Sequence, residues 1–329
     1  MHLESFSQRL FSIDNTNKFE SLALEVFHFQ SAGNIIYSEF IKGLGIDSSL
    51  VNEIKKIPFL PVEFFKSHKI ITGEDAYEKI FSSSGTTSEV SAQHYVKDIS
   101  LYEKVFTKAF TDFYGDPSEF VMLALLPSYL EREGSSLIYM MERLMKQSDK
   151  PLSGFYLHDV EKLFLTLNTL RENRQKTILF GVTYALLDFV SVYQMEFPEL
   201  IVMETGGMKG KRKEMIREEI HSLLCSGFGV ENIHSEYGMT ELLSQAYSKG
   251  KGVFKTPSWM QISIRDTYDP FMDAGINANG GINIIDLANV NSCSFLSTQD
   301  LGKVYADGSF EILGRFDFSD VRGCNLMID

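Results

Sequence analysis

Short apolar runs alternate with amphipathic segments between residues 120 and 224, and this alternation limits the fold more than any other feature of the sequence. The apolar runs lie at residues 120–125, 152–156, 177–180 and 200–203, and helical spacing follows them at 135–145, 159–171, 184–193 and 213–224. Short buried strands that alternate with helices are typical of βαβ units, whose strands are parallel. We therefore predict an α/β fold, in which Asp159 caps one of the helices.

The pattern of apolar and polar residues changes after residue 255. Short alternating runs at 261–265, 282–285, 303–305 and 309–313 are separated by turn signals at 279–281 and 306–308, which predicts antiparallel strands. Residues 1–56 have helical spacing, with Asp47 as the expected cap of a segment that ends near Lys56. Pro58 and Pro61 then predict an extended connector. The predicted class is α/β, with mixed, largely parallel sheets flanked by helices and a β-rich C-terminal portion.

Charge and cysteine usage narrow the class of protein. The chain has 31 basic and 44 acidic side chains and a net charge of −13. This argues against a nucleic-acid partner, so an anionic ligand needs local donors or a metal. Three cysteines without metal-ligand spacing fit a reducing compartment. No signal peptide is visible, and the apolar run at 121–126 is too short to span a bilayer. We predict a soluble cytoplasmic protein.

One segment is unusually rich in hydroxyl groups. Directly after an apolar pair, it contains Ser82, Ser83, Ser84, Gly85, Thr86 and Thr87. Such a stretch can curl its backbone N–H groups around an anion and add hydroxyl donors. It lacks the Gly-Lys-Ser/Thr ending of a P-loop. From composition alone, a phosphate-binding loop and a flexible turn are equally good interpretations.

Two further segments carry candidate ligands. In 236–241, Thr240 and Glu241 place a hydroxyl beside a carboxylate, which suits Mg²⁺ that also binds substrate phosphate; the alternative is a capped helix start with an acidic first turn. In 297–317, Asp300 can accept hydrogen bonds from ribose hydroxyls and Arg315 can supply a fixed positive charge. The alternative there is ordinary hairpin punctuation.

Taken together and in this order, these segments resemble the adenylate-forming superfamily of acyl-CoA synthetases, peptide-synthetase adenylation domains and luciferases. Residues 82–87 match its phosphate loop, and Tyr237-Gly238-Met239-Thr240-Glu241 matches its Tyr-Gly-x-Thr-Glu motif. Residues 298–302 are similar to Thr-Gly-Asp-Leu-Gly, and residues 314–317 to Gly-Arg-x-Asp. Gly206 and Gly207 lie where the family presents backbone to the adenine. Each motif alone is weak, but the four in order are specific.

Within this superfamily the chain is most similar to the LuxE-type acyl-protein synthetases, on residues 58–66, 131–137, 204–210 and 321–324. The resemblance implies that a fatty or other carboxylic acid is activated as acyl-AMP with ATP and Mg²⁺, and that the acyl group moves to a cysteine. It also implies an acyl reductase or acyl-carrier partner. The catalytic residues implied are Cys324, Glu241 (also the Mg²⁺ ligand) and Thr240. The nucleotide-binding residues implied are Ser82, Ser83, Ser84, Gly85, Thr86, Thr87, Gly206, Gly207, Tyr237, Gly238, Asp300 and Arg315.

The chain also departs from the family pattern. Ser88-Glu89-Val90 replaces the usual Gly-x-Pro-Lys continuation of the loop, and Gln299 replaces a glycine, which is expected to alter the turn. Because the sequence ends at Asp329, we expect the C-terminal lid domain and its adenylation lysine to be missing. We therefore expect a helical segment over 1–56, a nucleotide-binding core over 57–255 and a β-rich part of the same large domain over 256–329.

Some assignments stay open at the level of sequence. A non-adenylating binding partner and an acyl- or aryl-CoA ligase are alternatives to the acyl-protein synthetase. Cys324 could instead be a small apolar residue of a terminal strand, whereas Cys225 and Cys293 are expected to be structural. A lone histidine is more often structural than catalytic, so neither His94 nor His234 is assigned a role.

Overall fold

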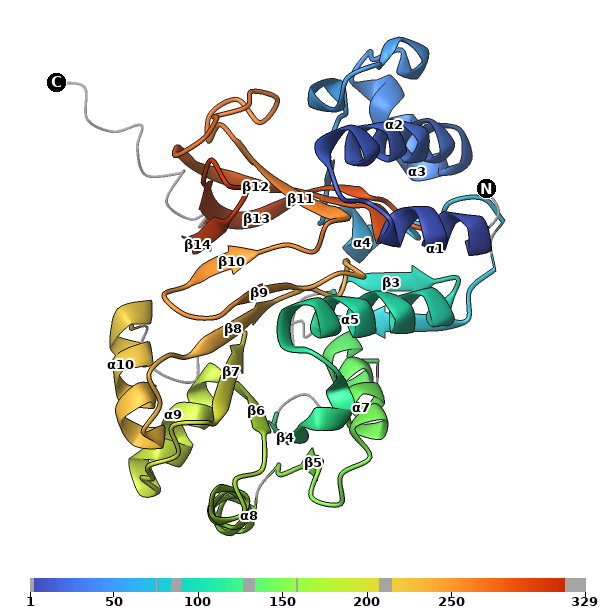
Figure 1. Cartoon of the computed structure of the whole chain (residues 1–329). Helices are drawn as coiled ribbons and strands as arrows, with labels where there is room; N and C mark the ends of the chain where they lie inside the picture. Colours follow the sequence, from blue (N-terminus) through green and yellow to red (C-terminus); the bar gives the residue numbers. More distant parts are fainter. Residues whose placement is uncertain are drawn as a thin grey trace, which may run out of the picture.

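A single mixed sheet organises the chain (Figure 1). The computed structural model describes residues 3–74, 76–83, 90–126, 134–157, 159–206 and 215–316. Across these residues the sheet has twelve strands in the order β11-β12-β13-β14-β10-β9-β8-β7-β6-β4-β5, and β1 (Leu60–Pro61) pairs with β13 off this path. The α/β class with a mixed sheet flanked by helices is confirmed.

One half of the sheet is parallel, as the alternating pattern predicts. Its strands are β5 (Gly154–Phe155), β4 (Val121–Leu125), β6 (Thr177–Val182), β7 (Ile201–Thr205) and β8 (His234–Tyr237). All residues of β4 and β6 are buried, as expected for parallel strands covered on both faces. The predicted runs therefore locate β5, β4, β6 and β7 to within a few residues, whereas β8, with the sequence His-Ser-Glu-Tyr, was not predicted.

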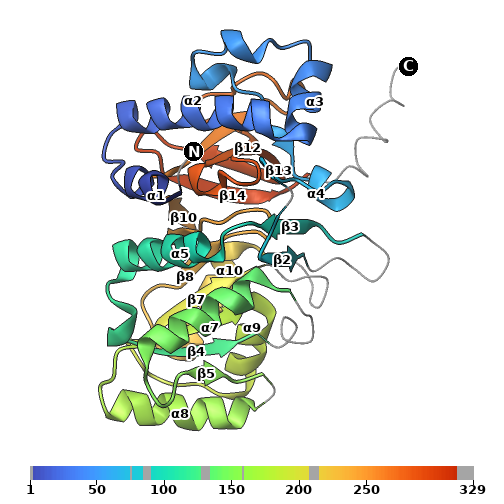
Figure 2. The ribbon, with the colours of Figure 1, turned by 90° about the vertical axis from the view of Figure 1, so that its right-hand side faces the viewer.

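Helices cover both faces of this parallel half (Figure 2). Helices α5 (Ile99–Tyr114) and α7 (Ser136–Ser148) lie on one face, and α9 (Thr183–Val192) and α10 (Arg217–Phe228) on the other. Helix α8 (Val160–Glu172) runs beside the β5 edge. The predicted cap Asp159 is confirmed, because its Oδ1 accepts a hydrogen bond from the Lys162 backbone N at 2.9 Å.

The other half is antiparallel, which confirms the prediction for the C-terminal portion. Its strands are β9 (Ala246–Ser248), β10 (Val253–Lys255), β11 (Met260–Arg265), β12 (Asn279–Asp286), β13 (Phe295–Val304) and β14 (Phe310–Arg315). The expected turn at 306–308 joins β13 to β14. Residues 303–304 end the long strand β13 and do not form a strand of their own.

The turn predicted at 279–281 is wrong, because these residues begin β12. Gly280 and Gly281 pair with Gly302 and Leu301 of β13. A Cβ atom on Gly280 would lie 2.2 Å from the backbone oxygen of Arg265, which is closer than any stable contact. The glycines therefore serve close packing of β11 against β12, and their sequence signal is the same as that of a turn.

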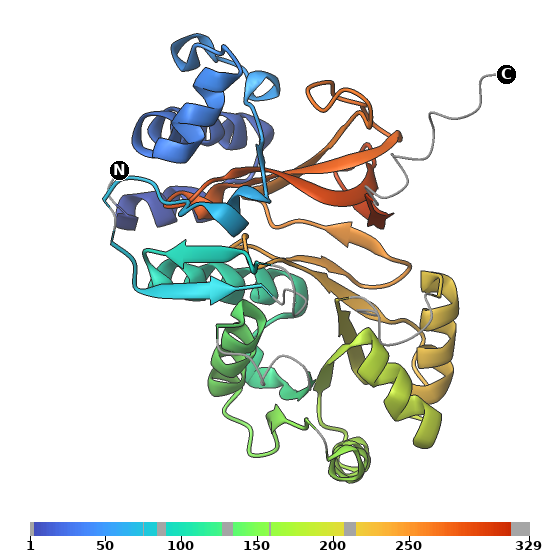
Figure 3. The same ribbon diagram turned by 180° about the vertical axis from the view of Figure 1, so that it is seen from behind.

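The N-terminal helices α1 (Leu3–Phe11), α2 (Thr16–Gly33) and α3 (Ile35–Gly43) pack against the antiparallel half (Figure 3). Gln30 of α2 donates hydrogen bonds to the backbone oxygens of Asn289 and Val290, both at 3.0 Å. Asp47 caps only a 3₁₀ turn at Ser48–Leu50, and a second turn follows at Ile54–Lys56, so the single capped segment expected there is wrong. The boundaries expected at residues 56 and 255 stay predictions.

The connector that follows leads to a separate hairpin. Residues 57–59 have no regular structure before β1 and the short helix α4 (Phe64–Ser67), which agrees with the extended connector that the prolines predict. Strands β2 (Lys79–Ser82) and β3 (Gln93–Val96) then form a two-stranded antiparallel sheet. Within the described part of the chain, no helix is long and apolar enough to cross a bilayer.

Candidate active site

Three of the predicted nucleotide-binding residues form a chain of hydrogen bonds. The Tyr237 hydroxyl, at the end of β8, donates to Asp300 Oδ2 at 2.8 Å. Arg315 Nε, at the end of β14, donates to Asp300 Oδ1 at 3.0 Å. Asp300 is buried in β13, so its carboxylate is held between two donors from other strands of the sheet. Each carboxylate oxygen can still accept another hydrogen bond, which leaves capacity for ligand hydroxyls.

The substitution of glutamine for glycine before Asp300 does not distort this arrangement. Gln299 lies inside β13 and does not have a positive φ angle. Its backbone oxygen accepts a hydrogen bond from Phe316 N at 2.8 Å, and the Thr298 hydroxyl oxygen accepts one from Asp300 N at 3.1 Å. The altered turn that we expected here is wrong, because a strand geometry at this position suits any side chain.

Glu241 is a buried carboxylate beside this chain. Burial raises its pKa to about 7, and the carboxylates of Asp300 and Glu63 act in the same direction, whereas its own backbone amide and Arg315 oppose the shift. Among the described residues, no side chain donates a hydrogen bond to the Glu241 carboxylate. Residues 240–241 form a turn that leads to β9, so the alternative of a capped helix start is wrong.

These properties fit a magnesium ion that takes most of its ligands from elsewhere. A buried carboxylate with nearby negative charge gains from a cation. No group of three or more His, Cys, Asp or Glu residues within the described ranges is placed to hold a metal. Glu241 would therefore share Mg²⁺ with phosphate and water oxygens, which is common for this ion.

The loop that carries Glu241 is fixed by residues that sequence reasoning missed. Asp286 Oδ2 accepts hydrogen bonds from the backbone N of Leu243 and Ser244, both at 3.0 Å, and its Oδ1 accepts one from the Ser244 hydroxyl at 2.6 Å. Asn289 Nδ2 donates to the Glu241 backbone oxygen at 2.7 Å. Asp286 is fully buried at the end of β12, and the sequence signal for it is one acidic residue after an apolar strand.

The hydroxyl-rich segment begins at the end of β2, next to this loop. Ser82 N donates to the Gly134 backbone oxygen at 2.8 Å, and Ser83 Oγ accepts from Ala92 N at 2.9 Å. The connection to the motif is His94 of β3, whose Nδ1–H donates to the Thr240 backbone oxygen at 2.8 Å. Burial lowers the pKa of His94 to about 4, so it is neutral at pH 7. The sequence signal for its burial is that His94 and the apolar Val96 lie two residues apart, and therefore on one face of a strand.

Several predicted residues lie outside the described residues. They are Ser84, Gly85, Thr86, Thr87, Gly207 and Cys324. The roles assigned to them stay predictions.

Cys293 is buried, and burial raises its pKa to about 12, which agrees with a structural role.

The end of β7 is held by a second polar network. Gly206 has a φ of +70°, which favours glycine, and its backbone oxygen accepts a hydrogen bond from the Thr183 hydroxyl at 2.6 Å. Glu204 accepts from Thr183, His221 and Ser235, each at 3.0 Å. The network ties the start of α9, helix α10 and strand β8 to the backbone that was predicted to face the adenine.

Glu236 is a buried acid directly before the Tyr-Gly motif. Its Oε2 accepts a hydrogen bond from the Thr205 hydroxyl at 2.6 Å. A Cβ atom on Gly238 would lie 2.5 Å from its Oε1, so glycine at position 238 leaves room for this carboxylate. Burial raises the pKa of Glu236 to about 7, although the Thr205 hydrogen bond opposes the shift.

This pKa predicts how stability depends on pH. Because the folded pKa is raised above the usual 4.5, Glu236 contributes stability below about pH 4.5 that is lost as the pH rises through about 7, amounting to about 3 kcal/mol. In Glu236→Gln, we expect urea unfolding to show a correspondingly smaller loss of stability between pH 5 and pH 8. Glu241 remains in both proteins and cancels in the difference. An unchanged pH dependence, as expected for the exposed control Glu39→Gln, would contradict this assignment.

The chain is similar to known proteins in structure, although no sequence match was found. No protein-family model matches the sequence, and no curated protein sequence matches it. An open conformation of 2-hydroxyisobutyryl-CoA ligase in complex with 2-HIB-AMP and CoA has a similar structure, with a TM-score of 0.68 and 12% identity over 92% of this chain and 70% of the ligase. The same ligase in the thioesterification state gives a TM-score of 0.64 and 13% identity over 96% of this chain and 68% of the ligase.

A second neighbour covers less of both chains. ATP-bound MatB from Rhodopseudomonas palustris matches with a TM-score of 0.53 and 16% identity over 72% of this chain. The chain spans 47% of the length of MatB. At these identities the likeness shows the fold alone. The chain has the large-domain fold of the adenylate-forming ligases.

Proposed function

We propose that the protein activates a carboxylic acid with ATP to form an acyl-adenylate and then transfers the acyl group to a thiol. The observation that carries this proposal is the Tyr237–Asp300–Arg315 chain beside buried Glu241, in a fold shared with a ligase that binds an acyl-AMP. The sequence predicts the four motifs in order along the chain. Hydrogen bonds join Tyr237, Asp300 and Arg315, which come from three of these motifs, and this supports the proposal.

The first step needs alignment and charge neutralisation more than covalent help from the protein. An oxygen of the substrate carboxylate forms a bond to the α-phosphorus of ATP, the bond from that phosphorus to the bridging oxygen breaks, and pyrophosphate leaves with its electron pair. Asp300 accepts hydrogen bonds from the ribose hydroxyls and Arg315 adds positive charge. Glu241 would hold Mg²⁺, which supplies charge neutralisation at the phosphates.

The second step is transfer to a thiolate. The sulfur attacks the acyl carbonyl, AMP leaves with the electron pair of the broken acyl–phosphate bond, and a thioester remains. By resemblance to the LuxE-type enzymes, we propose Cys324 as this acceptor and a fatty acid as the substrate. An acyl reductase or acyl-carrier partner would then take the acyl group.

A labelling experiment tests the acceptor. With radiolabelled acid and ATP, the protein should acquire label that neutral hydroxylamine releases, since hydroxylamine cleaves thioesters. Cys324→Ser should abolish the label, whereas the control Cys225→Ser, at a partly buried helical cysteine, should keep it. Label that survives in Cys324→Ser would exclude Cys324 as the carrier.

A CoA ligase is the second candidate, since the similar ligase structures were determined with CoA bound. In this case added CoA would become the acceptor and Cys324→Ser would retain activity. A third possibility, a binding partner that does not form the adenylate, predicts ATP binding without exchange of pyrophosphate into ATP. The exchange assay therefore separates both enzymes from the binding protein before any acceptor is known.

A further inference from the structure

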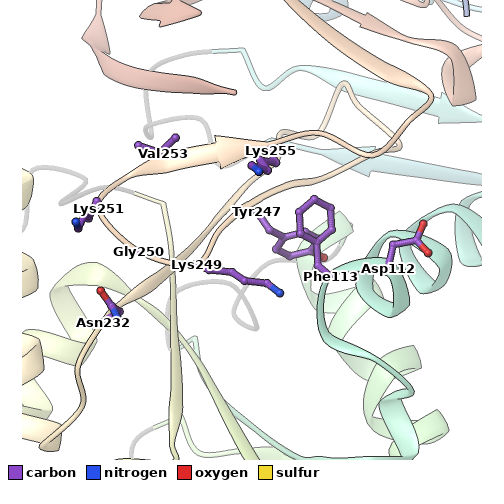
Figure 4. A pocket seen from close by; sticks show the side chains of 9 residues that line it. All are labelled: Asp112, Phe113, Asn232, Tyr247, Lys249, Gly250, Lys251, Val253 and Lys255. Atoms are coloured by element: carbon purple, nitrogen blue, oxygen red, sulfur yellow. The ribbon is translucent and has the colours of Figure 1, made fainter. Parts of the chain in front are cut away.

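A cavity of about 490 Å³ lies between the C-terminal end of α5 and the hairpin that joins β9 to β10 (Figure 4). Its volume is within the range of small-molecule pockets. Tyr247, which lines it, pairs across the strands with Glu236, so these two side chains share one face of the sheet. Tyr237 follows Glu236 and projects to the opposite face. The cavity is therefore separate from the Tyr237–Asp300–Arg315 site.

Positive charge is concentrated around this cavity, although the chain carries a net charge of −13. Lys249, Lys251 and Lys255 line it and are exposed. In the described part of the chain, no carboxylate forms a salt bridge with any of the three. The acidic residue in the lining, Asp112, is already paired with Lys108. Lys249 lies over the Tyr114 ring, 5.4 Å from its centroid, and Lys255 helps to lower the pKa of the Asp307 carboxyl. Both lysines stay exposed, so their ammonium groups can also contact an anion.

The same cavity has an aromatic wall. The rings of Phe113 and Tyr247 contact each other with centroids 5.1 Å apart. Tyr247 is 1% exposed, and its hydroxyl has no hydrogen-bond partner among the described residues. Buried hydroxyls of this kind are rare without a partner. The partly exposed ring of Phe113 lies beside the three lysines of the lining, which indicates a ligand that is both anionic and partly flat.

The hairpin holds its central lysine in an unfavourable backbone conformation. Lys251 has a φ of +58°, between two glycines, Gly250 and Gly252. Residues with a side chain rarely adopt this region, and glycine or asparagine is favoured there. Arg217 of α10 lies beneath the hairpin and donates to the Gly252 backbone oxygen at 3.4 Å. The hairpin therefore holds Lys251, one of the three lysines of the lining, at a conformational cost.

We propose that this cavity binds a small phosphorylated compound with an aromatic ring, the phosphate contacting the lysines of the hairpin and the ring lying against Phe113. A phosphate monoester carries close to two negative charges at pH 7, which matches several ammonium groups better than a single carboxylate does. Lysine binds phosphate as a point charge and tolerates varied geometry. The site is distinct from the adenylation site and does not depend on that activity.

Pyridoxal 5′-phosphate is a suitable probe, because its aldehyde condenses with a lysine amine, releasing water, and borohydride then reduces the imine to a stable secondary amine. Peptide mapping should find Lys249, Lys251 or Lys255 modified at least fivefold faster than the exposed control Lys146. Pyridoxal without the phosphate should show no such preference. Phenyl phosphate should protect the hairpin lysines, and inorganic phosphate should protect them less.

A binding measurement provides the second arm. Calorimetry with phenyl phosphate should give an affinity at least tenfold weaker for a variant with Lys249, Lys251 and Lys255 all changed to Gln. The matched control changes Lys42, Lys104 and Lys146 to Gln, which alters net charge equally at exposed sites, and should bind as the wild type does. Equal labelling of hairpin and control lysines, or equal affinities of the two variants, would overturn the proposal. Protection by inorganic phosphate equal to that by phenyl phosphate would reject the aromatic part.

Discussion

Asp300→Asn is expected to lower kcat/KM for ATP in pyrophosphate exchange by about 100-fold, equivalent to about 2.7 kcal/mol. In the wild type, the Asp300 carboxylate accepts hydrogen bonds from the Tyr237 hydroxyl at 2.8 Å and from Arg315 Nε at 3.0 Å. An asparagine can satisfy one of these donors, but its NH₂ group then faces the other donor. The substitution also removes the negative charge that would bind ribose hydroxyls, and hydrogen bonds to charged groups are the stronger kind.

The matched control for this variant is Asp307→Asn. Asp307 lies on an exposed turn of the same β13–β14 hairpin, where its Oδ1 accepts from Ser309 N at 3.0 Å. It changes the net charge equally but should leave exchange unchanged. Thermal unfolding of both variants checks that the fold is intact. Asp300→Asn with wild-type kcat/KM for ATP would show that Asp300 does not bind the nucleotide.

Glu241→Gln is expected to lower exchange by at least 100-fold at limiting Mg²⁺. The glutamine keeps the shape but loses the charge that would hold the ion. Because burial raises the pKa of Glu241 to about 7, protons compete with the cation below this pH. Wild-type exchange at limiting Mg²⁺ should therefore fall as the pH drops below about 7 and recover when Mg²⁺ is raised. The variant should lack this recovery.

A spectroscopic measurement separates metal binding from catalysis. Electron paramagnetic resonance of Mn²⁺ with ATP should show bound ion in the wild type and in the exposed control Glu39→Gln, and weaker binding in Glu241→Gln. If all three proteins bind Mn²⁺ equally, Glu241 is not a metal ligand, whatever the activities show.

The parallel half of the fold was predictable because its signals are local. Strands β4 to β7 lie in short apolar runs, and each helix has apolar spacing of its own, so these signals do not depend on distant contacts. Strand β8 has no such run and was not predicted. The error at Gly280 and Gly281 has the opposite origin. Glycine signals a turn and a close strand contact equally well, and only the position of Arg265 on the neighbouring strand distinguishes the two.

The residues of the candidate site were predicted from the order of the four motifs along the chain, because the residue spacing within each motif alone did not identify them. Tyr237 and Asp300 are 63 residues apart, and nothing local in either segment indicates their hydrogen bond. His94 contacts the backbone oxygen of Thr240 across 146 residues, and Asp286 fixes the loop after Glu241. These two residues act through burial and through distant backbone groups, so the local sequence around each of them does not reveal what it contacts.

Acid-dependent exchange of labelled pyrophosphate into ATP is the most direct test of the proposed function. The purified protein should show no exchange without a carboxylic acid and measurable exchange with at least one member of a panel of short, long-chain and aromatic acids. The same exchange should fall about 100-fold in Asp300→Asn. If ATP binds but no acid on the panel supports exchange, the protein does not form acyl-adenylates, and the proposed function is wrong.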